Sequence, residues 1–103
     1  MKGPIPVAEL NIFTMCPMTR KIITRQVQLV HSEPEVIARQ AYTEAKRLGL
    51  EWQAPTNIFT WSNNEHSRLL VLTIATHHKE ATYAHLWHIY GNELVKVQKL
   101  DNS

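Results

Sequence analysis

Histidines are the residues most able to do chemistry in this chain, which holds six of them and a single cysteine. His77 and His78 are adjacent, and His85 and His88 follow closely. A zinc site needs three or four ligands that converge at about 2 Å from the metal. On a strand, His85 and His88 point to opposite faces, and they converge only in a helix. No cysteine lies nearby and no His-Glu-x-x-His spacing occurs, so we expect neither a metal site nor a cofactor.

Nucleophilic catalysis would fall to Cys16, which would need a histidine base and an orienting group beside it. This cysteine lies between two methionines and directly before Pro17, and we expect a buried, unreactive thiol. The nine acidic residues fall mainly on expected caps, turns and the helix surface, and three glycines leave no Gly-rich phosphate loop. We therefore predict no catalytic residue, which favours a binding protein over an enzyme.

Basic residues are the candidates for contacts with nucleic acid. They fall on an expected strand and on the surface of an expected helix: Arg20, Lys21, Arg25, Arg39, Lys46 and Arg47. Residues 1–50 carry seven Lys and Arg against four Glu, whereas residues 51–103 carry four against five acids. Aromatic side chains on an open sheet can stack on bases, but a nucleic-acid-binding domain usually shows a denser basic stripe. Nucleic acid is therefore a possible partner that the sequence does not favour.

Length and composition indicate one globular domain over residues 1–103. The chain is 44% hydrophobic and 19% charged, which is typical of a folded domain. Residues 1–18 lack clear periodicity and are either irregular or a short N-terminal strand. The single cysteine is compatible with a reducing cytosol, and no apolar run approaches the roughly 20 residues that span a membrane. We expect a cytoplasmic protein with no membrane partner.

A helix over residues 33–48 is the strongest local signal. Ser32 and Glu35 have the spacing of a capping box, and Pro34 suits the first turn. Gly49 fits the left-handed position that commonly ends a helix. The apolar positions fall at helical spacing and form one narrow stripe: Ile37, Ala41, Ala45 and Leu48. This stripe should pack closely on a sheet.

Strand signals occupy much of the remaining chain. The expected strands cover residues 19–30, 57–61, 68–76, 83–90 and 93–100. Gly91 and Asn92 resemble the two-residue turn of a hairpin between the last two. Residues 82–90 also match a helical stripe, so a helix is the alternative there. We prefer the strand because the turn and the alternating pattern after it need a partner directly upstream.

This order of elements predicts an α+β fold. One helix would pack on a mainly antiparallel sheet of four to five strands, in a roll-like strand-helix-four-strand meander. By topology alone this order is similar to the cystatin-like arrangement. A shared fold does not confer a function.

Regular hairpins would sort the side chains into two faces of the sheet. The helix-covered face would include Phe59, Trp61, Leu70, Leu72, Ile74, Leu86, His88, Tyr90, Val95 and Val97. The second face would carry Leu69, Val71, Tyr83, His85, Trp87, Ile89 and Lys96. It is more apolar than a solvated sheet face usually is. Either the N-terminal segment covers it, or it meets a partner.

These observations predict a small non-enzymatic binding or regulatory module that associates through the second face, with a homodimer preferred over a different protein partner. The first alternative is a small-ligand-binding protein or small enzyme, with a cleft between helix and sheet that uses Trp61, His88 and Tyr90. The second alternative is an accessory nucleic-acid-binding protein. The identity of any small-molecule ligand is unknown from the sequence.

Overall fold

The computed structural model describes residues 8–27, 29 and 33–101, with side chains described up to Glu93. Its elements follow in the order β1 (Ala8–Met15), β2 (Ile22–Val27), α1 (Pro34–Leu48), β3 (Glu51–Gln53), β4 (Asn57–Ser62), β5 (Arg68–Ile74) and α2 (Thr76–Asp101). The predicted α+β class with an antiparallel sheet is confirmed. The predicted single helix is wrong, because the described chain contains a second one.

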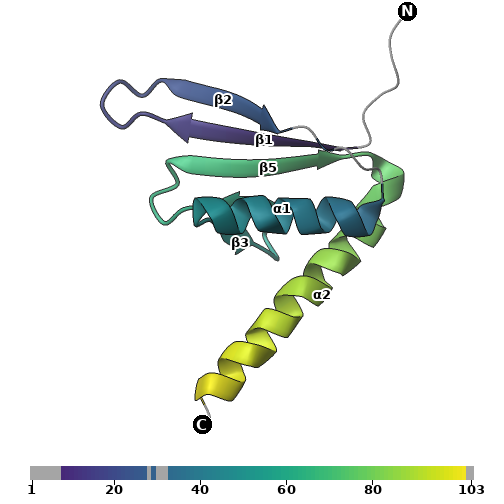
Figure 1. Cartoon of the computed structure of the whole chain (residues 1–103). Coiled ribbons are helices and arrows are strands. Elements are labelled where there is room, and N and C mark those ends of the chain that lie inside the picture. Colours follow the sequence, from purple (N-terminus) through teal and green to yellow (C-terminus); the bar gives the residue numbers. More distant parts are fainter. Residues whose placement is uncertain (1–7, 28, 30–32, 102–103) are drawn as a thin grey trace, which may run out of the picture.

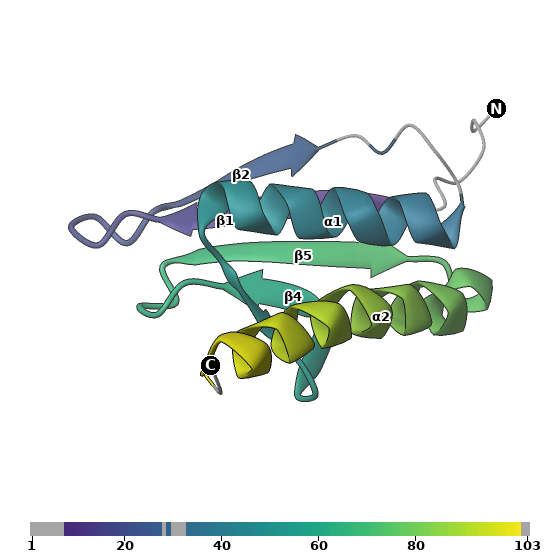
Figure 2. The same ribbon diagram turned by 60° about the horizontal axis from the view of Figure 1, so that its bottom comes forward.

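The five strands form one antiparallel sheet in the order β2-β1-β5-β4-β3. Both helices lie on the same face of this sheet (Figures 1 and 2). The alternation of β1 explains how the core forms, because Ala8, Leu10 and Ile12 are buried beneath the helices while the residues between them face the other way. Residues 8–15 of the N-terminal segment therefore form strand β1, between β2 and β5, whereas residues 1–7 lie outside the described residues.

Helix α1 follows its sequence signals closely. Its buried residues are Ile37, Ala38, Ala41 and Ala45, and Leu48 of the predicted stripe is partly buried against the same core. At its end Gly49 has φ 70°, and Leu50 donates its backbone N–H to Ala45 at 2.9 Å and is buried. The predicted cap is displaced: the N-cap residue is Glu33, which makes no side-chain cap, and Ser32 lies outside the described residues.

Helix α2 replaces the two strands predicted over 83–90 and 93–100. Thr82 and Leu86 are one helical turn apart and both are buried, and Tyr90 packs against the same core one turn later. The alternative of a helix over residues 82–90 is therefore correct, because Thr82, Leu86 and Tyr90 pack into the core beside α1. Gly91 and Asn92 are consequently helical rather than a hairpin turn.

The second helix also overturns the meander and its cystatin-like order. The sheet is completed instead by the N-terminal pair β1 and β2 and by the short strand β3. The sequence did not predict β3. Strands β2, β4 and β5 confirm three predicted strands with slightly different ends. No helix in the described part of the chain is long and apolar enough to cross a membrane.

Candidate functional site

The face of the sheet opposite the helices is covered by no other described element (Figures 1 and 2). We call it the open face. Strand alternation and register place on it the apolar residues Phe13, Met15, Ile22, Ile58, Leu69 and Val71. Phe13 lies opposite Leu69 at its centre. None of these six residues packs against the core cluster beneath the helices.

The open face carries little charge. Strands β1, β2, β4 and β5 contain three charged residues in all, Glu9, Arg25 and Arg68. Register places Arg25 opposite Ile12 and Arg68 opposite Thr14, both on the helix side, which leaves Glu9 on the open face. On the short strand β3, Glu51 lies opposite Ser62 and adds a second acid at the edge of this face. The remaining polar residues on the open face of these four strands are neutral, among them Asn11 and Thr73. An apolar face with so little charge can meet a similar surface without repulsion.

A shallow pocket of about 280 Å³ lies at one end of the open face. Its walls are Phe13, Met15, Ile22, His66, Ser67 and Leu69. The turn between β4 and β5 fixes its rim, because Asn63 donates to Ser67 at 2.9 Å and accepts from the backbone N–H of Arg68 at 3.1 Å. The pocket gives this face a concave point where a partner's side chain can insert.

A second feature is an aromatic cluster between α1, α2 and the β3–β4 edge. It contains all three tryptophans and all three tyrosines of the chain: Tyr42, Trp52, Trp61, Tyr83, Trp87 and Tyr90. Trp52 stacks on Tyr90 with ring centroids 4.5 Å apart and meets Trp87 edge-on at 4.6 Å. Trp61 is fully buried and donates its indole N–H to the Tyr90 hydroxyl at 2.8 Å.

A cleft of about 440 Å³ opens beside this cluster. It is lined by Lys46, Leu50, Glu51, Trp52, Ala54, Trp87 and Tyr90. Glu93 accepts a hydrogen bond from Tyr42 and pairs with Lys46 at 3.1 Å. The bond to Glu93 raises the pKa of Tyr42 to about 12, and burial raises the pKa of Tyr90 to about 12. Both phenols are therefore neutral near pH 7 and act as hydrogen-bond donors or acceptors rather than bases.

The structure brings together two of the three residues predicted for a ligand cleft. Trp61 and Tyr90 are in contact, and Tyr90 lines the cleft. His88 is exposed on α2, so the expectation of a core histidine at this position is wrong. The helix turns its side chain away from the core that holds Leu86 and Tyr90.

The predicted partner face is divided between two elements. Leu69 and Val71 lie on the open face. Tyr83, His85, Trp87 and Ile89 lie on α2, on the other side of the sheet, and Trp87 keeps 38% of its surface exposed. The side chain of Lys96 lies outside the described residues. The grouping was wrong because a helix, not a strand, carries the second half.

The candidate nucleic-acid contacts are also separated. Arg20, Lys21 and Arg25 lie on the β1–β2 hairpin, at its turn and along β2. On α1, Arg39 pairs with Glu35 at 3.2 Å, Lys46 pairs with Glu93, and Arg47 pairs with Glu44. The helix cations are thus neutralised locally and do not extend the basic hairpin into one surface.

Cys16 is exposed in the hairpin turn, which contradicts the expected burial. Hydrogen bonding with Thr19 lowers the pKa of its thiol. No group of three or more metal-binding side chains occurs within the described residues. His77 and His78 contact each other through their rings, 4.2 Å apart.

Sequence reasoning missed two parts of these sites. Phe13, Met15 and Ile22 were not assigned to a face, although the alternation of Ala8, Leu10 and Ile12 would have placed them. Trp52 was not considered, because the short strand that carries it has no pattern of its own. Comparison with protein-family models, curated proteins and solved structures finds no match for this chain.

Proposed function

We propose that this chain is a small, non-enzymatic binding or regulatory module of the cytoplasm that forms a homodimer through its open face. One observation carries the proposal: both helices pack on one face of the sheet and leave six apolar side chains on the other. An exposed apolar patch of this kind is typical of an interaction surface. The proposal keeps Leu69 and Val71 from the predicted partner face and moves its centre to β1 and β5.

The low charge of the open face supports a second copy as the partner. In a symmetric dimer each residue meets the same patch of the partner, so a charged patch would repel itself. In this chain Phe13, Leu69 and Val71 lie in the middle of the open face. Among the residues of the four longer strands, the charged side chain on this face is that of Glu9. Two such sheets can stack about 10 Å apart, with apolar side chains interleaved.

Leu69→Lys tests this proposal, because it places a charge at the centre of the face without touching the helix-packed core. The variant should be a folded monomer, whereas wild type should be a dimer at micromolar concentrations by analytical ultracentrifugation. Thr43→Lys, which adds the same charge to the exposed side of α1, should remain dimeric. A monomeric wild type would refute the homodimer. Circular dichroism establishes whether both variants are folded.

A small-ligand site is the second candidate function, and the aromatic cleft favours it. Trp52, Trp87 and Tyr90 offer ring surfaces, and Lys46 and Glu51 supply polar groups at the rim. Ligand pockets commonly combine apolar walls with a few polar groups in this way. A thermal-shift screen with small ring-containing metabolites, repeated on Trp87→Ala, tests this alternative. A nucleic-acid function has less support, because acidic neighbours pair the cations of α1.

A further inference from the structure

The outer edge of β2 is a second accessible surface, separate from the open face. β2 is the end strand of the sheet and pairs with β1 alone among the described strands. An end strand leaves the backbone N–H and C=O groups of alternate residues without a ladder partner. Ile22 and Ile23 on this strand are 64% and 68% exposed, so neither face of β2 is covered at its first two residues.

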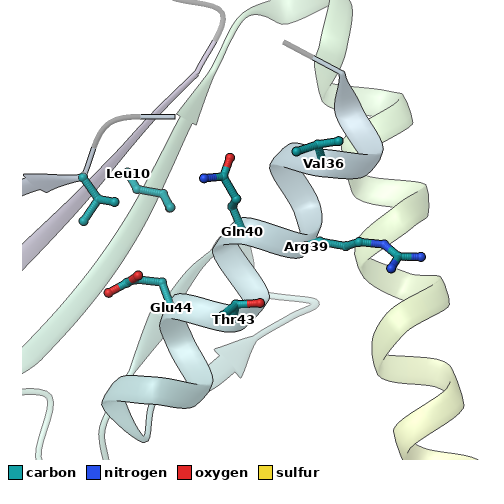
Figure 3. Close-up of a pocket in the computed structure, with 7 residues that line it drawn as sticks. Leu10, Val36, Arg39, Gln40, Thr43 and Glu44 are labelled. Atoms are coloured by element: carbon teal, nitrogen blue, oxygen red, sulfur yellow. The ribbon is translucent and has the colours of Figure 1, made fainter. Parts of the chain in front are cut away.

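A groove lies between this strand and α1. Its volume is about 280 Å³, and it is lined by Leu10, Val27, Val36, Arg39, Gln40, Thr43 and Glu44. Figure 3 shows Gln40 and Glu44 on the Leu10 side of α1, whereas Arg39 points away. The Gln40 Oε1 atom is buried and has no hydrogen-bond partner.

We propose that an extended acidic peptide segment of another protein adds to the edge of β2 as an antiparallel strand and inserts an apolar side chain into this groove. Strand addition obtains affinity from main-chain hydrogen bonds and specificity from pockets for alternate side chains. β2 supplies the hydrogen bonds, and the groove beside Val27 supplies the pocket.

Charge identifies the partner as acidic. Residues 14–27 contain Arg20, Lys21 and Arg25 and no Asp or Glu. Two copies of β2 paired edge to edge would bring six cations together, which disfavours self-pairing at this edge. Glu44 lines the groove and pairs with Arg47, so the inserted side chain is apolar and the partner's acids lie toward the hairpin turn.

Alternation along β2 predicts the partner's pattern. Ile23, Arg25 and Val27 alternate with the open-face residues and therefore share the helix side. Lys21 directly precedes β2 and continues this alternation. An antiparallel neighbour should place apolar residues opposite Val27 and Ile23, and acids opposite Arg25 and Lys21. The peptide Val-Thr-Glu-Thr-Val-Thr-Glu has this order, and its threonines face the neutral Thr24 and Gln26 side.

Fluorescence anisotropy with this labelled peptide tests the proposal. Wild type should bind it and should bind a control peptide with lysine in place of both glutamates about tenfold more weakly. Arg25→Glu should remove most of that preference, because the variant side chain favours lysine at the third peptide position while Lys21 still favours glutamate at the seventh. Lys79→Glu, an equal charge change on exposed α2, should keep the wild-type preference.

Equal affinity of wild type for both peptides, or an Arg25→Glu variant that keeps the full tenfold preference for the acidic one, would overturn the proposal. Absence of binding would overturn it as well. The proposed peptide site lies at the edge of β2 and on the helix side of the sheet, whereas Leu69 lies on the open face. The Leu69→Lys variant should therefore bind the acidic peptide like wild type. Failure of the dimer and failure of the peptide site are therefore distinguishable.

Discussion

At the scale of single residues, the contact between Trp61 and Tyr90 is the most consequential hydrogen bond of the aromatic cluster. It joins β4 to α2, and the indole that donates it is fully buried. Tyr90→Phe would keep the ring and leave that N–H without an acceptor, at a cost of about 1–3 kcal/mol. Urea denaturation should show this loss, with a smaller one for Tyr83→Phe at the rim of the cluster. Equal stability of Tyr90→Phe and wild type would mean that the bond contributes nothing.

The two perturbed phenols predict how stability depends on pH. The pKa values of Tyr42 and Tyr90 rise to about 12 in the folded chain from a usual value of 10.0. Between these values the unfolded chain loses phenolic protons that the folded chain retains, so the free energy of unfolding should fall as pH rises. Below pH 10 the contribution of both groups is fully present.

Denaturation series at several alkaline pH values check this expectation. Tyr42→Phe and Tyr90→Phe should each make the fall between pH 10 and 12 shallower, since each removes one titrating group. A slope that neither variant changes would show that other groups cause the alkaline loss of stability.

At the scale of elements, Gly91 distinguishes the observed helix from the hairpin that its neighbours suggest. In the helix, a Cβ at Gly91 would meet nothing within 4 Å, so Gly91→Ala should stabilise the chain by up to about 1 kcal/mol. In a hairpin turn the same change would be destabilising, because the turn needs a positive φ there. Thermal unfolding gives the sign. Gly49→Ala, at φ 70°, should destabilise and serves as the comparison.

The sequence predicted those elements whose signals are local. Helix α1 has a proline in its first turn, a narrow apolar stripe and a terminal Gly49, and each of these acts within one turn of the chain. Strands β4 and β5 alternate clearly between bounding turns. Residues 82–90 fit both a period of two and a helical period, and residues 93–100 follow a period of two. Their state is decided by the packing of Leu86 and Tyr90 against the core, which sequence spacing alone does not determine.

The same limit explains what was predicted of the candidate sites. Leu69 and Val71 were placed together because they belong to one correctly assigned strand. Trp87 was placed beside them because its segment was read as the neighbouring strand. Trp52 and Tyr90, which are far apart in the chain, stack in the aromatic cluster only because α2 crosses above β3. Such contacts depend on tertiary arrangement.

At the scale of the whole molecule, the fold separates its surfaces. Two helices cover one face of a five-stranded sheet, and β2 lies at one edge of that sheet (Figures 1 and 2). The other face is mainly apolar, and the outer edge of β2 carries basic residues and has no strand neighbour among the described residues. The neutral face suits a second copy, and the basic edge suits an acidic strand. The proposed dimer would therefore leave the edge of β2 accessible to the proposed peptide partner.

The most direct test of the central claim is a nuclear Overhauser experiment on a mixture of isotope-labelled and unlabelled copies of the chain. It detects contacts between molecules and assigns them to residues. We predict that the methyl groups of Leu69 and Val71 show contacts to the aromatic protons of Phe13 in the other copy. Intermolecular contacts confined to Ile23 or to α2, or their complete absence, would contradict dimerisation through the open face.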